Sequence, residues 1–267
     1  ALPILSSSRV TLLLVLRQSL RQQHSSMTPR SSLKPLADSV KQWSASTSLT
    51  FLHHTASLIV AGNFQHLRIG VLAFQGDVRE HIQVLEELGA QVSKVRRPDE
   101  LAAVDALVIP GGESSVMDKL VRLFGMQQPL RDAIASGLPV FGTCAGLIMM
   151  ADHIVDAIAE QESLGGLHVD VRRNAFGTQI DSFEVDLEMP GVTAEPVPAT
   201  FIRAPIVERV GEGVRVISQL ADGRIVAVEQ GYLLGISFHP EVNGDTRVHE
   251  YFLGRVAQSV AEKKASI

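Results

Sequence analysis

The chain has 267 residues, of which 45% are hydrophobic and 20% charged, with a formal net charge of −5 at pH 7. This is the composition of an ordinary soluble globular protein, and one α/β domain with a single substantial core is the leading expectation. The only cysteine cannot form an intramolecular disulfide, so nothing supports a secreted, disulfide-stapled scaffold, and a reducing compartment is the simpler assumption.

The charge is unevenly distributed along the chain. Residues 1–66 contain six Lys and Arg against Asp38 alone, a net charge of +5, which leaves −10 for residues 67–267. The first part is rich in Ser, Thr, Gln and Leu and lacks the regular strand and helix pattern that begins at Leu67. We therefore expect residues 1–66 to be an N-terminal extension outside the core and residues 67–267 to form the domain.

Three interpretations of the extension compete. A cloned or mistranslated leader is favoured because the chain begins with Ala and Met27 could be a start. An Arg- and Ser-rich, acid-poor segment also resembles an organellar transit peptide, and the apolar run at 10–16 weakly resembles a signal core but is too short to span a bilayer. We expect a cytoplasmic protein without a membrane partner. The acidic domain has no Lys and Arg cluster, which argues against nucleic acid as a partner.

From Leu67 onward, short apolar runs alternate with amphipathic segments. The run 67–74 predicts a strand, Gln75, Gly76 and Asp77 a turn, and the spacing of apolar residues in 78–88 a helix that Gly89 can close. This alternation continues and predicts a mostly parallel sheet covered on both faces. Strands are expected at 91–95, 105–110 and 138–142, helices at 116–125 and 129–137, then short strands at 167–171, 183–187, 200–204, 214–218, 224–230 and 232–238, and a final helix at 246–262.

The single cysteine, Cys144, lies in the pattern Gly-Thr-Cys-Ala-Gly between a buried strand and an apolar helix. This is the thiol counterpart of the G-x-S-x-G nucleophile elbow, in which small residues permit a sharp turn. A helix N-terminus favours thiolate, and the backbone N–H of Ala145 can face an oxyanion. A buried structural cysteine is the alternative, since most free cysteines only pack.

A thiol nucleophile needs a base, and one of the nine histidines stands out. His239 follows a late strand, and Glu241 stands two residues further on, so both side chains point to the same side of extended backbone. This predicts nucleophile, base and orienting carboxylate in the order Cys144, His239, Glu241. A surface His beside a Glu is the alternative.

A glycine pair, Gly111-Gly112, ends another strand at the same edge of the sheet. It could be a plain turn or a phosphate cradle, but no G-K-[ST] follows, which argues against a phosphate loop. The remaining role is an oxyanion hole formed by the N–H groups of Gly112 and Ala145.

Together these motifs resemble the class I, triad glutamine amidotransferases with a flavodoxin-like sheet, and within them the glutaminase subunit of pyridoxal 5′-phosphate synthase. GxCxG and HPE alone indicate only a triad amidotransferase, whereas GGES, RNAFG and FIRAP select the vitamin B6 branch. The resemblance covers residues 67–255. It is carried by GVLAFQGDVREH, PGGESS, FGTCAG, RRNAFGTQIDSFE, FIRAP, GRIVA and SFHPE.

The resemblance implies that Cys144 attacks the side-chain amide of L-glutamine, releases ammonia and forms a glutamyl thioester that water cleaves. His239 would be base and then acid, Glu241 its orienter, and Gln75 a candidate gating residue, although a turn residue is the alternative. No metal or cofactor is expected. The glutamine site would comprise Gly112, Glu113, Ser114, Arg173, Ile202 and Arg203.

Some features of the glutamine site stay open. An Arg suits an α-carboxylate and a Glu an ammonium, but which residue contacts which end does not follow from the sequence. The choice of Arg173 over Arg172 rests on the motif alone. Ser114-Ser115 departs mildly from the Ser-Thr usual in the family, and the variable loop at 150–166 is uninformative.

The resemblance also implies a partner, a (β/α)8-barrel synthase subunit in a large hetero-oligomer that combines ammonia with pentose and triose phosphates. Another triad amidotransferase or a non-catalytic module of the same fold is the alternative, as is a small cysteine peptidase on a similar sheet. Such peptidases have His directly after the elbow cysteine, where this chain has Ala145.

Overall fold

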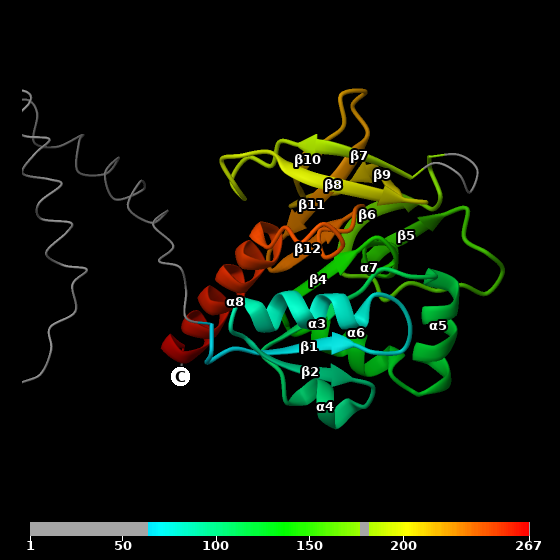
Figure 1. Ribbon diagram of the computed structural model, residues 1–267. Coiled ribbons are helices and arrows are strands. Elements are labelled where there is room, and N and C mark those ends of the chain that lie inside the picture. The colour runs from blue at the N-terminus through cyan, green and yellow to red at the C-terminus, as the bar shows by residue number, and fades with distance from the viewer. Residues whose placement is uncertain (1–63, 177–181, 267) are drawn as a thin grey trace, which may run out of the picture. The chain divides into compact units, whose positions relative to one another are not determined.

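The computed structural model describes residues 64–176 and 182–266, coloured from cyan to red in Figure 1. Of the expected N-terminal extension, residues 1–63 lie outside this part, as do residues 177–181 of the RRNAFGTQIDSFE motif. The described residues form a ten-stranded sheet, a separate two-stranded sheet and helices packed on the sheet.

One half of the large sheet is parallel and follows the order β2-β1-β3-β4-β12. Its central strands are apolar because both faces are covered: β3 and β4 are buried at every position. Since parallel strands end at the same edge, the loops after β1, β3, β4 and β12 are brought together. The bounds are β1 Arg68–Leu72, β2 Gln91–Val95, β3 Ala106–Ile109, β4 Val140–Thr143 and β12 Leu233–Ile236.

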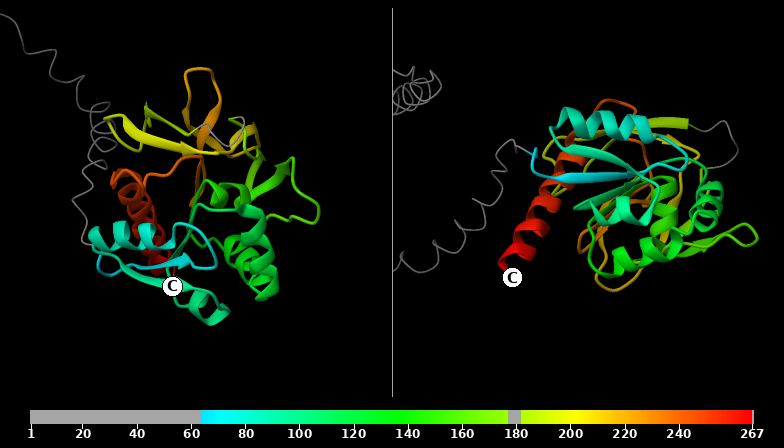
Figure 2. Two further views of the ribbon diagram at one scale, coloured as in Figure 1. Left: turned by 45° about the vertical axis from the view of Figure 1, so that its right-hand side comes forward. Right: turned by 90° about the horizontal axis from the view of Figure 1, so that it is seen from below.

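The other half of the sheet is mixed. From β12 it continues as β11-β9-β6-β5, with β10 paired to β11, and only β5 and β6 are parallel to each other. The antiparallel pair of β7 and β8 and the helix α4 lie at opposite ends of the described part of the chain (Figures 1 and 2). The bounds are β5 Ala151–Val155, β6 Leu167–Arg172, β7 Ser182–Leu187, β8 Val197–Ile202, β9 Ile206–Val210, β10 Arg215–Gln219 and β11 Ile225–Gln230.

Helices cover both faces of the sheet. Because side chains alternate along a strand, β3 sends Leu107 and Ile109 into the core beneath α4, α5, α6 and α7, and Ala106 and Val108 into the core beneath α3 and α8. The sheet is therefore the middle layer of three. The bounds are α3 Val78–Glu87, α4 Pro98–Ala102, α5 Ser114–Leu123, α6 Gln127–Ala135, α7 Ala145–Met150 and α8 Arg247–Ala265.

These observations confirm the predicted α/β class and the mostly parallel sheet with extra short strands in the C-terminal half. Three elements were not predicted. The helix α4 has five residues, too few for a periodic pattern, and β5 and β9 lie outside the parallel core and carry exposed polar residues that hide the strand alternation.

The long helix α8 covers one face of the sheet and packs on it with apolar side chains at helical spacing, among them Leu253. We expect Leu253→Ala to lower the free energy of unfolding by about 2–5 kcal/mol, because the side chain is fully buried and leaves a cavity. The matched control is Leu123→Ala, whose leucine is 76% exposed. Urea unfolding measures both, and equal midpoints would contradict the assignment of α8 to the core.

Candidate active site

The loops after β1, β3, β4, β6 and β12, together with the C-terminal end of β8, line a cavity of about 280 Å³. This is near the lower end of the range for small-molecule sites, roughly 300–1,000 Å³, and suits a single amino acid. All the predicted site residues except Ala145 and Glu241 line it. The lining residues are Gln75, Asp77, Gly112, Glu113, Ser114, Cys144, Ile148, Arg173, Asn174, Ile202, Arg203 and His239.

Cys144 stands in a strained turn between β4 and α7. Its φ of +46° lies in the region that L-residues avoid, and its N–H donates to the Ile236 carbonyl at 2.8 Å. The flanking residues must be glycines because neither position has room for a side chain. A Cβ on Gly142 would lie 2.6 Å from the carbonyl carbon of Gly146, and one on Gly146 would overlap the Ile109 carbonyl oxygen. The Gly-x-Cys-x-Gly pattern is thus a packing requirement of the elbow.

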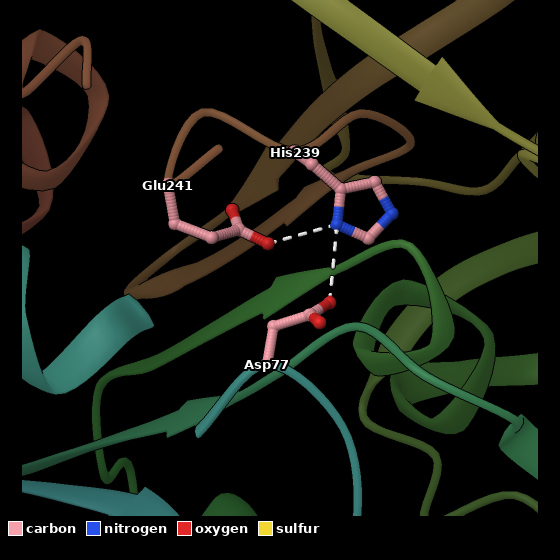
Figure 3. Close-up of side chains that lie close together, drawn as sticks. All are labelled: Asp77, His239 and Glu241. Carbon is pink, nitrogen blue, oxygen red and sulfur yellow. Dashed lines mark hydrogen bonds and ion pairs between the residues drawn. The ribbon is translucent and has the colours of Figure 1, made fainter. Parts of the chain in front are cut away.

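His239 and Glu241 lie together beyond β12. The Nδ1 atom of His239 is 2.8 Å from Glu241 Oε1, and the backbone N–H of His239 donates to the Thr200 carbonyl at 3.0 Å. Both side chains are buried. A second carboxylate, Asp77, approaches the same nitrogen at 3.4 Å, so that both acids point at one ring atom (Figure 3). The other side of the imidazole, with Nε2, is therefore left for a reacting group.

The electrostatics favour a protonated His239. Burial alone would lower its pKa, but hydrogen bonds with Asp77, Cys144 and Glu241, together with the charge of Cys144, outweigh burial and raise the pKa to about 12. Burial raises the pKa of Glu241, and the hydrogen bond from His239 offsets part of this rise. Since several acceptors surround the imidazole, the shared proton stays on the ring and Glu241 accepts.

The two predicted oxyanion donors belong to different loops. The Gly111 carbonyl accepts from the Asp77 N–H at 3.2 Å, and because C=O and N–H of a trans peptide point in opposite directions, the N–H of Gly112 is turned away from that bond. Gly112 has a φ of +149°, and a Cβ there would lie 2.5 Å from the Gln75 amide oxygen. Ala145 is the first residue of α7, where the backbone N–H lies outside the helical ladder.

Charged side chains surround the far end of the cavity. Arg173 donates to Glu113 at 2.9 Å and to Gln161 at 2.8 Å, and Gln161 in turn donates to the Ser114 hydroxyl at 3.1 Å. Arg172 points elsewhere, toward Asp156 and Glu208 on the surface. The alternation of side chains along the backbone thus separates the two neighbouring arginines.

Gln75 and the C-terminal end of β8 complete the wall of the cavity. The amide oxygen of Gln75 accepts from the Glu113 N–H at 2.8 Å, which ties the turn after β1 to the glycine loop. Ile202 is 40% exposed, and Arg203 has a φ of +45°, which turns the chain at the end of β8. The neighbouring Ala204 carbonyl accepts from the Ala175 N–H at 3.0 Å and so joins this loop to the segment of Arg173.

Sequence reasoning missed four lining or supporting residues. Asp77 was treated only as part of a turn, Asn174 only as a letter of the RNAFG motif, and Ile148 only as part of the apolar helix after Cys144. Gln161 lies in the loop 150–166 that was considered uninformative, although it bonds Arg173 directly. No signal in the sequence marks Gln161, because its role depends on where a distant loop folds back.

Within the described ranges 64–176 and 182–266, one group of side chains has donor atoms that could hold a metal ion. It consists of Asp77, His239 and Glu241, whose donor atoms lie within 4.8 Å of one another. None of the helices in these ranges is both long and apolar enough to cross a membrane.

The model of a protein family described as the SNO glutamine amidotransferase family matches residues 71–258. The chain belongs to this family. A protein of Leifsonia xyli subsp. xyli named pyridoxal 5′-phosphate synthase subunit PdxT is 67% identical over 189 residues, which cover 71% of this chain and 96% of the relative. A protein of the same name from Kineococcus radiotolerans is 56% identical over 199 residues, covering 72% and 96%.

Solved structures agree with this membership. A crystal structure of a glutamine amidotransferase is 46% identical with a TM-score of 0.66, covering 71% of this chain and 98% of its own. The structure of PurLQS from Thermotoga maritima, at 18% identity and a TM-score of 0.55, covers 73% and 99% and shares the fold. The resemblance inferred from the motifs is confirmed, and the cysteine-peptidase alternative is excluded.

Cys144 is the only cysteine, so its reactivity can be measured without interference. We expect His239→Asn to slow alkylation of the protein by iodoacetamide at pH 6–7 by at least about tenfold, because an adjacent imidazolium favours the reactive thiolate. The matched control is His153→Asn, whose histidine is largely exposed on β5. Mass spectrometry of the labelled chain gives the rates. Equal rates in wild type and His239→Asn would show that the imidazole does not activate the sulfur.

Proposed function

We propose that this chain is the glutaminase subunit of a pyridoxal 5′-phosphate synthase, which hydrolyses L-glutamine to L-glutamate and ammonia and supplies the ammonia to a synthase subunit. One observation carries the proposal: the elbow cysteine and a buried, carboxylate-held histidine line one cavity of amino-acid size. Relatives at up to 67% identity named for that synthase support the pathway. Residues 67–267 are proposed to carry the activity.

In the first half of the reaction, the Cys144 thiolate attacks the side-chain amide carbon of glutamine and a carbon–sulfur bond forms. The carbonyl oxygen becomes an oxyanion, which accepts hydrogen bonds from the N–H groups of Gly112 and Ala145. The tetrahedral intermediate then collapses, the carbon–nitrogen bond breaks, and the His239 imidazolium donates a proton to the departing ammonia. A glutamyl thioester remains on the enzyme.

In the second half, water attacks the thioester. Neutral His239 accepts a proton from the water, the same N–H groups hold the second oxyanion, and glutamate leaves as the thiolate reforms with its imidazolium partner. Glu241 keeps the ring oriented and stabilises the imidazolium. The cycle begins and ends with a free thiol, which the reducing conditions of the expected cytoplasmic location would preserve.

The charged end of the cavity is proposed to hold the amino-acid end of glutamine. Arg173 suits the α-carboxylate through a bidentate pair, and Glu113 suits the α-ammonium. The two side chains bond each other at 2.9 Å, so glutamine would exchange this ion pair for its own two charges. Ser114, Ile202 and Arg203 would complete the wall.

The product implies a gated partner. Free ammonia protonates in water at neutral pH. A glutaminase that supplies ammonia to a synthase therefore benefits from hydrolysing glutamine only when it is bound to that synthase. We propose that a (β/α)8-barrel synthase docks near the turn after β1, where Asp77 holds the Gly111 carbonyl and Gln75 holds Glu113. Movement of that turn would reorient the Gly111-Gly112 peptide, and one misdirected oxyanion donor costs roughly 10²–10³ in rate.

Ammonia release from saturating L-glutamine is expected to rise at least about tenfold when the synthase subunit is added to the full-length chain. Cys144→Ser should abolish release in the complex, and His239→Asn should be nearly as damaging, whereas Glu241→Gln should leave more residual rate because the orienter is the mildest loss. Co-elution on gel filtration checks that each variant still binds the synthase.

Failure of the wild-type complex to release ammonia would overturn the glutaminase assignment. Equal rates with and without the synthase would overturn the gating step alone. Absence of co-elution would contradict the assignment to pyridoxal 5′-phosphate synthesis, since that pathway requires the subunit to deliver ammonia to its partner.

The two neighbouring arginines give a matched test of the binding site. Arg173→Ala should raise the KM for glutamine by roughly tenfold or more, because a charge-assisted pair to the α-carboxylate is lost. Arg172→Ala, which removes an arginine paired with surface carboxylates, should leave KM within about twofold of wild type. Steady-state kinetics on the complex measures both, and equal KM values for the two variants would refute the assignment of Arg173.

A further inference from the structure

Behind the triad carboxylate lies a buried pair of histidines that the reaction above does not use. His81 on α3 and His249 on α8 are both fully buried, and His81 Nδ1 lies 2.9 Å from His249 Nε2. The other nitrogen of His81, Nε2, lies 3.1 Å from the Thr143 hydroxyl and 3.6 Å from Glu241 Oε1. His81 therefore touches both the residue before the nucleophile and the orienting carboxylate.

Both histidines of the pair are neutral at physiological pH. Burial, and then the neighbouring His249 and His239, lower the pKa of His81 well below its ordinary value. Burial lowers the pKa of His249 to about 4, against an opposing effect of Asp245. A neutral imidazole has one N–H and one bare nitrogen, so the contact between the rings allows only two arrangements of protons.

The carboxylate selects between these arrangements. If His81 carried its hydrogen on Nδ1, its bare Nε2 would face the negative Glu241, and the His249 N–H would be buried without an acceptor. If His249 donates from Nε2 to His81 Nδ1, the His81 Nε2–H faces Thr143 and Glu241, and only the bare Nδ1 of His249 lacks a partner, as is found among the described residues. The second arrangement leaves no buried donor of the pair unpaired.

Glu241 has few hydrogen-bond donors around it. Its Oε2 is buried and has no hydrogen-bond partner within the described ranges, and its Oε1, which accepts from His239, is the oxygen that His81 Nε2 approaches. At 3.6 Å the His81 contact is longer than a hydrogen bond, but in a buried site an N–H dipole at this distance still stabilises a carboxylate. Asp77, the other charged group facing Glu241, acts in the opposite sense and favours its protonated form.

We propose that His81, held in its Nε2–H form by His249, is a positioning residue that keeps Glu241 ionised and directed at His239. The inference rests on the proposed glutaminase function of the same site. It also gives α3 a part in the chemistry, because the backbone N–H of His81 donates to the carbonyl of Asp77, the residue whose own N–H holds the Gly111 carbonyl. The N-terminal end of α3 thus supports both the loop of Gly111 and Gly112 and the carboxylate of the triad.

The test compares His81→Phe, which keeps a ring but no nitrogen, with His81→Gln, whose amide N–H can occupy the place of Nε2. In the complex with the synthase, His81→Phe should lower kcat by roughly five- to tenfold, the size of one polar contact, with KM for glutamine unchanged. Loss of the N–H raises the pKa of Glu241 further, so the acidic limb of the kcat/KM profile should move to higher pH. His81→Gln should recover most of both effects.

A second readout does not depend on glutamine. The pH profile of Cys144 alkylation by iodoacetamide should shift in the same direction for His81→Phe and return toward wild type for His81→Gln. His249→Phe should give an intermediate shift, because it releases the proton arrangement but keeps the His81 ring. The control is His153→Phe on β5, which should match wild type. Melting temperatures report any loss of folding separately.

The outcomes separate the two proposals. If the wild-type complex releases no ammonia, the glutaminase function fails, and the alkylation profiles still decide the role of His81. If His81→Phe has the wild-type kcat and pH profiles, or if His81→Gln and His81→Phe lose activity equally without a pH shift, His81 only packs and the inference is overturned. An alkylation profile of His249→Phe identical to wild type would overturn the part assigned to His249.

Discussion

The close approach of α7 to β3 is the constraint on which the site depends. Gly146 lies so near the Ile109 carbonyl that a Cβ would overlap it, and a Cβ on Gly142 would lie 2.6 Å from the backbone of Gly146. This contact forces the chain to turn within one residue, and Cys144 takes up the strain at a φ of +46°. A bulkier elbow would displace the sulfur from the edge where the other three loops meet.

A second constraint is electrostatic and concerns the burial of His239 and Glu241, the two members of the triad that share a proton. His239 and Glu241 are both buried, which by itself disfavours charge on either. The charged form is held because each group has further polar neighbours: Asp77 and Cys144 for the imidazole, and the histidine pair on α3 and α8 for the carboxylate. The two helices that carry the histidine pair, α3 and α8, share one face of the sheet, so packing of that face and the ionisation of the triad are linked.

The contacts between the turn after β1 and the glycine loop, Gly111-Gly112, explain how a partner could regulate the reaction. The turn after β1 holds the glycine loop through two hydrogen bonds, from Asp77 N–H to Gly111 and from Glu113 N–H to Gln75. The nucleophile stands on the buried strand β4 and the helix α7, which no docking protein can reach directly. The proposed regulation through this turn would therefore leave the thiol in place and change only the N–H groups that stabilise the oxyanion in the transition state.

The sequence by itself determined the alternation of parallel strands and helices, the elbow at Cys144, the pairing of His239 with Glu241 and the family, because each depends on residues close together in the chain. Short elements with few buried residues, such as α4 and β9, left no such local pattern. The motif favoured Arg173 over Arg172, and the structure places Arg173 at the cavity. Tertiary structure alone decided that Gln161 bonds Arg173 and that His81 lies against Glu241, although His81 and Glu241 are far apart in the chain. Those contacts arise where separate elements pack on one sheet, and no short-range periodicity records which side chains will meet there.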